Sequence, residues 1–385
     1  MKVYYITRSY LPSYTGGTLI RAKYVELLKQ NGLEVEVLTV NYNNNSYYVS
    51  EVNGIIVRYF PHNLNLRFGM CLERIGIVED YLDYWVKVVI RYMKQEVKSE
   101  DVVFCTSGGE LASIKIGSIL KKRTNCKFVI NFHDPIDYTL VNGLKIDNRF
   151  HVSREKTERK YISGADLIIT SSDTLRKSLA KKYNELSMKI KNSYFGYLDY
   201  YNEHKTKEYD GILKIVYGGN FGTLQCPEIF AKAASEFEDV HVYFVGNSSR
   251  YIPIHRYKNE KYVHFYDYMP YDEYCRFVSN EMDCGCVSLV SDYLGACVPS
   301  KVYEFINLST PMIACLPDGD AKDLVDKNKY GLSCLYFDFD ALCTIIKRLK
   351  NKDTINGFRD KINRDKHKWA MSELIKPIVR LINEI

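Results

Sequence analysis

Short apolar runs alternate with amphipathic stretches along almost the whole chain. The opening run KVYYIT precedes a glycine-containing turn and a helix-like segment, SYTGGTLIRAKYVELLKQNG. Further apolar runs follow as LEVEVLTV, IIVRYF, VVFC, KFVINF and DLIIT, and helical patterns separate most of them. Strands that alternate with helices predict a parallel sheet covered by helices on both faces.

The same alternation begins again after a polar, tyrosine-rich stretch, YLDYYNEHKTKEYDGI. We therefore predict an α/β protein of two Rossmann-like, doubly wound domains, at residues 1–198 and 212–367, joined by a linker at 199–211. A C-terminal helix at about 368–385 is expected to pack back on the first domain. Because such sheets bind ligands beyond the carboxyl ends of their strands, two facing domains would bind their ligand in a central cleft.

Composition agrees with a soluble protein of two domains. The chain has 385 residues, of which 46% are hydrophobic and 26% charged. Its apolar runs are too short for a membrane span, and its first residues lack the apolar core of a signal peptide, so we expect a cytoplasmic protein. The 11 cysteines are scattered and are expected to be reduced thiols, with no pair at the spacing of a zinc site.

Positive charge is concentrated in the first half. Residues 1–195 carry a formal charge of +9 and the remainder −3. This half also contains NLNLRFGMCLERIGIVEDYLDYWVKVVIRYMK, in which aromatic and aliphatic residues interleave with Arg67, Arg74, Lys87, Arg91 and Lys94. Such a stretch can bind at an anionic membrane surface, although an ordinary core helix with a solvated basic face gives the same pattern.

Two glycine-containing loops each lie between a strand and a helix. The first has Gly16 and Gly17, followed by Arg21, and the second has Gly218, Gly219 and Gly222. Small residues there let backbone N–H groups approach an anion or a sugar. Neither loop has the spacing G-x-G-x-x-G, so a dinucleotide site is disfavoured.

The segment CVPSKVYEFINLSTPMIA is the most informative of the chain. Pro299 and Ser300 are expected to begin a helix, whose free N–H groups and the Lys301 ammonium suit a phosphate. Glu304 lies one turn further on, where its carboxylate could accept hydrogen bonds from ribose hydroxyls.

This segment resembles the donor-site signature of retaining family 4 glycosyltransferases, which have the GT-B fold, and in particular the branch that makes bacterial cell-surface polysaccharides. The runs YGGNFGTLQ, ADLIITSSDTLRKSLAKKY and GGTLIRAKYVELLKQNGLEVEVLT resemble the same family in the same order, over most of the chain. The family signature has two glutamates with seven residues between them. Glu304 matches the second, whereas Ala296 stands at the first.

The resemblance implies a set of site residues. His133, with Asp134 beside it, would lie near the reacting sugar, and the first loop would contribute Gly16, Gly17 and Arg21. Asn220 stands where the family commonly has a cation, so Lys301 or Arg21 would neutralise more of the diphosphate. The donor would contact Gly219, Asn220, Gly222, Thr223, Ser300, Lys301, Val302 and Glu304.

The expected activity is transfer of a sugar from a nucleotide diphosphate sugar to a glycan or polyprenyl-linked acceptor, with retention and without metal. The N-terminal domain is expected to bind the acceptor and the C-terminal domain the nucleotide sugar. The tripeptides at 318–320 and 338–340 have the form Asp-x-Asp, but we interpret them as a loop before a helix and a helix N-cap. No cofactor and no nucleic acid partner are expected. The cytoplasmic enzyme is further hypothesised to attach peripherally to the inner face of the plasma membrane. Two alternatives stay open: a nucleotide-sugar epimerase of the same fold, and a non-catalytic nucleotide-sugar-binding partner.

Overall fold

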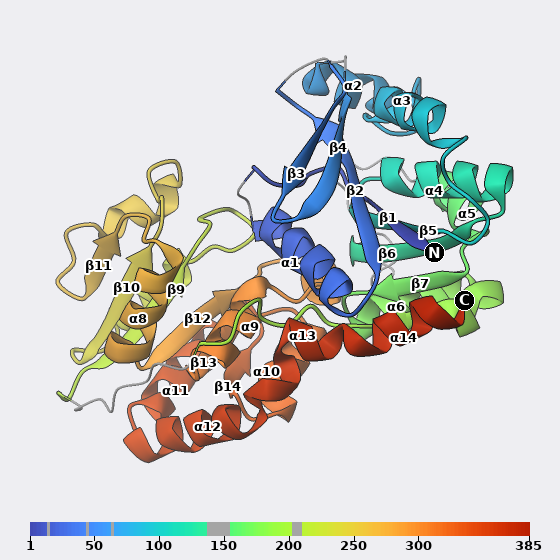
Figure 1. Cartoon of the computed structure of the whole chain (residues 1–385). Coiled ribbons are helices and arrows are strands. Elements are labelled where there is room, and N and C mark those ends of the chain that lie inside the picture. Colours follow the sequence, from blue (N-terminus) through green and yellow to red (C-terminus); the bar gives the residue numbers. More distant parts are fainter. Residues whose placement is uncertain (14–15, 44–45, 63–64, 137–154, 202–209) are drawn as a thin grey trace. The chain divides into compact units, whose positions relative to one another are not determined.

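The computed structural model describes residues 1–13, 16–43, 46–62, 65–136, 155–201 and 210–385. It divides into two compact units (Figure 1), the first made of residues 1–195 and 374–385 and the second of residues 196–373. Each has a mixed α/β architecture around one largely or wholly parallel sheet.

The first unit contains an eight-stranded sheet in the order β3-β4-β2-β1-β5-β6-β7-β8. All neighbouring strands are parallel except β3 and β4, which pair antiparallel at one edge. The strands are β1 (Lys2–Ile6), β2 (Glu34–Asn41), β3 (Tyr48–Val52), β4 (Ile55–Pro61), β5 (Val102–Gly108), β6 (Lys127–Asp134), β7 (Leu167–Thr170) and β8 (Ile190–Asn192).

Helices connect these strands and cover the sheet. They are α1 (Gly16–Gln30), α2 (Leu66–Arg74), α3 (Asp83–Met93), α4 (Ala112–Thr124), α5 (Glu155–Ile162), α6 (Asp173–Lys182) and, from the end of the chain, α14 (Lys376–Glu384). The C-terminal segment joins this unit at its first residue, where Ser193 Oγ donates to Leu374 O at 3.1 Å. Strands β5 and β6 are buried along almost their whole length, as strands of a sheet covered on both faces are.

The second unit contains a six-stranded parallel sheet in the order β11-β10-β9-β12-β13-β14. Its strands are β9 (Leu213–Gly218), β10 (Val240–Val245), β11 (Val263–Tyr266), β12 (Cys284–Ser288), β13 (Met312–Cys315) and β14 (Gly331–Cys334). Its α-helices are α7 (Glu228–Ala234), α8 (Tyr271–Glu281), α9 (Ser300–Asn307), α10 (Asp320–Lys327), α11 (Phe339–Leu349), α12 (Lys352–Asp365) and α13 (Met371–Leu374). The strand order is that of the Rossmann fold, so the predicted architecture of two Rossmann-like units is confirmed.

Local signals place several helix ends. Ser172 Oγ accepts from Leu175 N at 3.1 Å at the start of α6, and Asp338 caps α11 by accepting from Ala341 N at 2.9 Å. Asp338 is therefore the helix N-cap that the sequence predicted. Asn125 ends α4 with a φ of 55°, a left-handed conformation that asparagine adopts more easily than most residues.

Helix α4 approaches the first sheet closely because it carries Gly117. A methyl group at this position would overlap the Phe128 ring and lie 2.6 Å from Cys105 Sγ. Both neighbours are fully buried core residues on adjacent strands. The absence of a side chain at Gly117 therefore sets the distance between the helix and the sheet.

We expect Gly117→Ala to destabilise the protein, because overpacking a close-packed core costs about 1–3 kcal/mol. Gly357 is the matched control: it also lies within a helix, α12, but a methyl group there would meet no atom within 4 Å. Gly357→Ala should preserve or raise stability by up to about 1 kcal/mol. Urea unfolding followed by circular dichroism checks both, and equal midpoints for the two variants would contradict this account of the α4 packing.

Candidate functional site

The order of strands in the second sheet reverses between β9 and β12. Ligands of open parallel sheets bind beyond the carboxyl ends of the strands at such a switch point. In this unit the β9 end leads into Gly218 and Gly219, and the segment after β12 leads to α9. The predicted donor-binding residues are therefore brought to this edge from two separate parts of the chain.

The loop after β9 depends on its glycines. Gly219 has a φ of 104°, and a methyl group there would lie 3.0 Å from Lys301 Cε and 3.3 Å from Lys301 Nζ. A methyl group at Gly218 would overlap the Tyr274 ring. Only glycine fits both the conformation and the space at 219, so the backbone of this loop lies directly against Lys301.

The rest of the loop is held by short local contacts. Asn220 O accepts from Tyr217 OH at 2.7 Å, and Thr223 O accepts from Cys226 Sγ at 3.2 Å. A methyl group at Gly222 would lie 2.8 Å from Gln225 Oε1, so this residue is also closely packed. Local contacts therefore hold the carbonyl groups of Asn220 and Thr223.

Lys301 lies at the start of α9, with Nζ 3.6 Å from the centroid of the Tyr217 ring. The side chain is only partly exposed, and burial lowers the pKa of its ammonium to about 7, against the opposing influence of Glu304 and Cys286. Such a lysine is charged most easily when an anion lies beside it. The cation–π contact with Tyr217 fixes the position of the Lys301 ammonium group.

Glu304 follows one turn along α9. Burial raises the pKa of its carboxyl to about 7, and the nearby Lys301 opposes the shift. Tyr271 and Tyr274 of α8 lie nearby, and the pKa of each phenol is raised, first by burial and then by the negative charge of Glu304. A partly desolvated lysine and glutamate one helical turn apart form a group whose protonation a bound ligand can change.

Two further predicted donor residues belong to the same turn of α9. Ser300 is exposed as the first residue of the helix, whereas Val302 is fully buried and points into the core. Val302 can therefore contribute to a ligand through its backbone but not through its side chain.

Ala296, which stands at the first glutamate of the family signature, is 1% exposed in the short helix at Asp292–Ala296. Its neighbour Gly295 approaches the turn before α10 so closely that a methyl group at Gly295 would overlap Asp318 O, and one at Gly319 would overlap Gly295 O. A glutamate in this region would have to fit a backbone packed directly against a neighbouring turn.

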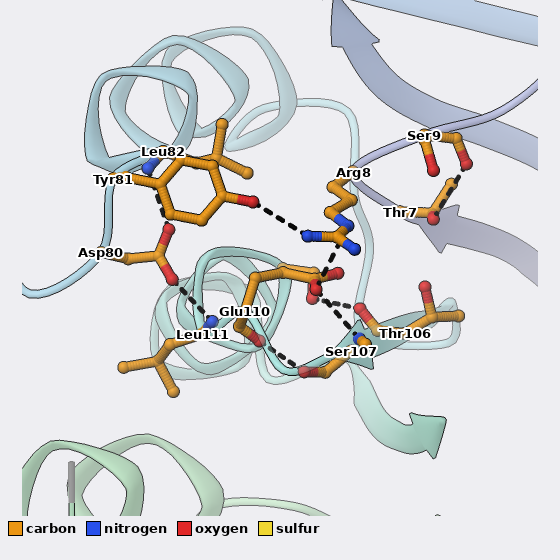
Figure 2. Close-up of polar contacts among 12 residues, drawn as sticks. Thr7, Arg8, Ser9, Asp80, Tyr81, Leu82, Thr106, Ser107, Glu110 and Leu111 are labelled. Carbon is orange, nitrogen blue, oxygen red and sulfur yellow. Dashed lines mark hydrogen bonds and ion pairs between the residues drawn. The ribbon is translucent and has the colours of Figure 1, made fainter. Parts of the chain in front are cut away.

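In the first unit, the strand order reverses between β1 and β5. Three charged side chains lie together beyond these strands: Arg8 follows β1, Arg21 belongs to α1, and Glu110 follows β5. Figure 2 shows Arg8 and Glu110 with their polar contacts. A methyl group at Gly108 would lie 3.1 Å from Arg21 Nη2, 3.6 Å from Glu110 Oε2 and 3.8 Å from Arg8 Nη2. We refer to Arg8, Arg21, Glu110 and His133 as the edge cluster.

His133 joins this cluster from the end of β6. It is 9% exposed, and its ring lies 4.5 Å from the Phe195 ring, centroid to centroid. Burial, with smaller effects of Arg21 and Arg8, lowers the pKa of the imidazole well below its usual value, so the ring is neutral at pH 7. Asp134 next to it is half-buried.

The predicted residues of the first loop lie at the start of α1. Gly16 and Gly17 are its first two residues, and a methyl group at Gly17 would lie 3.9 Å from Arg21 Nη1. Arg21 is 4% exposed and donates from Nη1 to Ser9 Oγ at 2.6 Å. Among the described residues, none offers a carboxylate that pairs with this guanidinium.

Sequence reasoning missed Arg8, Glu110 and Tyr81. The carboxyl ends of all strands in a predicted parallel sheet meet at one edge. Arg8 directly follows the first apolar run and Glu110 follows VVFCTSGG, so both could have been chosen as candidate site residues from their positions alone. Tyr81 carried no such signal: it precedes α3 and reaches Arg8 Nη1 with its hydroxyl at 3.0 Å only through the fold.

Among the described residues, no group of three or more histidine, cysteine, aspartate or glutamate side chains is arranged to hold a metal ion. Asp318 pairs with Lys322 at 3.5 Å, and Asp338 is used as a helix cap. No described helix is long and apolar enough to cross a membrane.

Exposed apolar side chains are concentrated in one segment of the first unit. The segment from Leu66 to Ile77, which contains α2, exposes five large hydrophobic side chains: Leu66, Phe68, Met70, Ile75 and Ile77. The basic residues Arg67, Arg74, Lys87, Arg91 and Lys94 on α2, on α3 and beside them are exposed as well. We refer to these ten side chains as the α2 surface.

Sequence comparison with family models and with curated proteins gives no match. Solved structures are nevertheless similar over the whole chain. The apo form of the lipopolysaccharide outer core galactosyltransferase WaaB has a TM-score of 0.73 at 14% identity, covering 100% of this chain and 99% of its own.

HepE of Anabaena in complex with UDP-glucose has a TM-score of 0.68 at 14% identity, covering all of both chains. A trehalose-6-phosphate synthase analysed for glycosyl transfer with retention has a TM-score of 0.71 at 9% identity, covering 100% and 99%. Two Rossmann-like units in one chain, similar throughout to these enzymes, establish that this protein has the GT-B fold.

Proposed function

We propose that this protein is a glycosyltransferase that moves a sugar from a nucleotide diphosphate sugar to a glycan or lipid-linked acceptor. The observation that carries the proposal is the arrangement at the switch point of the second unit, where Gly219, Lys301 and Glu304 converge. Its support from outside the chain is the whole-length similarity to HepE with UDP-glucose and to WaaB, a galactosyltransferase.

Each group at this edge matches one part of a nucleotide diphosphate sugar. The free N–H groups of the first turn of α9 and the Lys301 ammonium favour a diphosphate, whose charge grows as the sugar departs. The Glu304 carboxylate accepts hydroxyl hydrogen bonds, as ribose requires. Because helix N–H groups and lysine supply the positive charge, we propose that the reaction needs no metal ion and no cofactor.

The stereochemical and biological parts of the proposal rest on similarity. Retention at the anomeric carbon follows the sequence resemblance and the similarity to a trehalose-6-phosphate synthase analysed for transfer with retention. A role in surface polysaccharide biosynthesis follows the same resemblance and the similarity to WaaB. His133, neutral and at the edge of the first sheet, is proposed to position the reacting sugar, with Asp134 and the loop at Gly16 and Gly17 beside it.

The proposal predicts that one or more nucleotide sugars raise the melting temperature and support transfer to lipid-linked acceptors in the presence of a chelator. A ligand at one hundred times its Kd stabilises the folded protein by about 2.7 kcal/mol. Glu304→Gln should weaken donor binding by about 1.5–3 kcal/mol, because it removes a charged hydrogen-bond acceptor.

The matched control for this measurement is Glu273→Gln, which changes an exposed glutamate on α8 of the same unit. Its donor affinity in calorimetry should equal that of the wild type. An epimerised donor without a glycosylated product would indicate the epimerase, and binding without either reaction would indicate a non-catalytic partner. Loss of activity in chelator with recovery on adding magnesium would refute the metal-free mechanism.

The pKa of Lys301 predicts a further property of donor binding. At about pH 8 the free protein holds this lysine largely neutral, since its pKa is about 7. A diphosphate favours the charged form, so binding should take up protons. Below pH 7 the uptake should give way to proton release. Lys301 is already charged there, and Glu304, whose pKa is also about 7, loses its proton when its carboxylate accepts hydrogen bonds from hydroxyl groups.

Calorimetry in buffers of different ionisation enthalpy measures this uptake directly. In Lys301→Met the uptake should be absent at the same pH. Equal apparent enthalpies in all buffers with the wild-type protein at about pH 8 would show that Lys301 does not face the diphosphate.

We also propose that the α2 surface binds an anionic membrane, which brings the enzyme to a lipid-linked acceptor at the cytoplasmic face. Five exposed apolar side chains can insert shallowly into the headgroup region, while each basic residue near an anionic leaflet contributes about 1 kcal/mol. The two contributions together give reversible binding.

We expect the protein to sediment with phosphatidylglycerol-containing vesicles at low salt, less at high salt, and little with neutral vesicles, because the attraction is screened. Phe68→Ser with Ile75→Ser should reduce sedimentation. Val49→Ser with Ile56→Ser is the control, since these exposed side chains lie on β3 and β4 outside the α2 surface. Equal loss in both variants, or equally weak sedimentation with both vesicle types, would count against membrane attachment.

A further inference from the structure

Two cysteines of the second unit lie directly opposite each other on neighbouring strands. Cys315 ends β13 and Cys334 ends β14, and the two residues are paired in the parallel register of these strands. Their Sγ atoms are 3.6 Å apart, and both are free thiols. Neither belongs to the residues proposed to bind the donor, so the close approach of their sulfurs needs its own explanation.

The backbone geometry at this pair fits a disulfide. Adjacent strands lie about 4.8 Å apart, which is inside the range of Cα separations, about 4.4–6.8 Å, that disulfides span. Residues in register on neighbouring strands point to the same face of the sheet, so both sulfurs lie on one side. They must approach from 3.6 Å to about 2.05 Å, a change that side-chain rotation and a slight approach of the strands supply.

The register of the sheet selects this pair among the cysteines of the second unit. On its other side, Cys315 is in register with Ser288 of β12. Cys286 of the same strand is in register with Ile313, two residues before Cys315. Strand β14 is the edge strand of the six that the structure describes in this sheet. The register therefore brings Cys334, and not Cys286, directly opposite Cys315.

The two thiols differ in how easily they ionise. Cys315 is 1% and Cys334 6% exposed, and both belong to the apolar core of the second unit. The hydrogen bond between the sulfurs lowers the pKa of Cys334, against the effect of burial, and together with burial it raises the pKa of Cys315. Of the charges near Cys334, Lys322 favours the thiolate, whereas Asp338 and Asp326 oppose it. Because the thiolate is the reactive form, Cys334 is the nucleophile of the pair.

We propose that Cys315 and Cys334 form a reversible redox site, which hydrogen peroxide converts from two thiols into a disulfide that joins β13 to β14. The Cys334 thiolate attacks one peroxide oxygen, the O–O bond breaks, and a sulfenic acid forms while the leaving hydroxide takes up a proton and becomes water. Cys315 then attacks this sulfur, so that the S–S bond forms, the S–O bond breaks and the Cys315 proton leaves with hydroxide as a second water. The pair loses two electrons, and the peroxide gains them.

The place of the pair in the fold gives this bond a consequence. Cys334 ends an edge strand of four residues, whose local opening admits a small oxidant. The bond closes the loop of residues 316–333, which contains α10 and the turn at Gly319 that lies against Gly295. Closing a loop restrains the unfolded chain and stabilises the folded one. Disulfides in reducing compartments are usually transient and redox-sensing, so the thiol form is the resting state there.

The test is peptide mapping of the folded, full-length protein after treatment with hydrogen peroxide, with the remaining thiols alkylated in denaturant. The peptides that carry Cys315 and Cys334 should be joined, with a mass lower than their sum by two hydrogens, and dithiothreitol should separate them. A tryptic digest keeps Cys334 and Cys343 in one peptide, so the variant Cys343→Ala assigns the linkage. Oxidation of the exposed Cys71 shows that the oxidant acted. The linked protein should melt at a higher temperature than the reduced one.

Alanine variants separate the pair from the other thiols. Cys315→Ala and Cys334→Ala should each abolish the linkage and the rise in melting temperature. Cys286→Ala is the matched control, because Cys286 is also fully buried and lies on the strand next to Cys315. This variant should preserve both the linkage and the rise.

Several outcomes would overturn the proposal. They are complete alkylation of Cys315 and Cys334 while Cys71 is oxidised, linkage of Cys315 to Cys286 or Cys343 instead, and linkage only after unfolding in urea. Equal loss of the linkage in Cys286→Ala would show general loosening of the core, and a linked protein that melts no higher would refute the stabilising consequence. Nucleotide-sugar binding is measured separately, so failure of the proposed function would leave the redox site standing.

Discussion

Parallel pairing of strands is the constraint from which both candidate sites follow. When neighbouring strands run in the same direction, each connection must cross the sheet, and all carboxyl ends meet at one edge. In both units the chain begins at the centre of the sheet, at β1 or β9, and winds first to one side and then to the other. The segments after β1 and β5, and those after β9 and β12, are therefore adjacent although about a hundred or about seventy residues separate them.

Much of this architecture could be predicted from the sequence, because the alternation of apolar runs and helical stretches is clear in both halves. The Asp338 cap was also predictable, since a short acceptor side chain directly preceded an amphipathic helix. The strand order was not, because apolar runs carry no information about which neighbour they pair with. The antiparallel strand β3 at the edge, with its exposed Tyr48 and Val49, had no distinct pattern of its own.

The donor-site residues were named from a resemblance to a family. The structure adds their contacts: the Lys301 ammonium lies over the Tyr217 ring, and Gly219 lies close to Lys301 Cε and Nζ. The edge cluster shows the opposite case. Arg8 and Glu110 belong to no recognisable sequence motif, and only the fold reveals that Glu110 Oε2 pairs with Arg8 and accepts from Gly108 N. Whether a buried polar atom has a partner depends on segments distant in sequence, so no local pattern can show it.

The Tyr217 ring has a consequence for how this protein can change over evolution. One face of the ring holds the Lys301 ammonium, while the ring also lies within 6.4 Å, centroid to centroid, of Phe221, Phe230 and Phe244 in the apolar interior. Repacking that interior would move the ring and, with it, the charge that stands on it. A substitution in this part of the core would therefore also disturb the position of Lys301. Substitutions among these aromatic residues should for that reason occur together rather than singly.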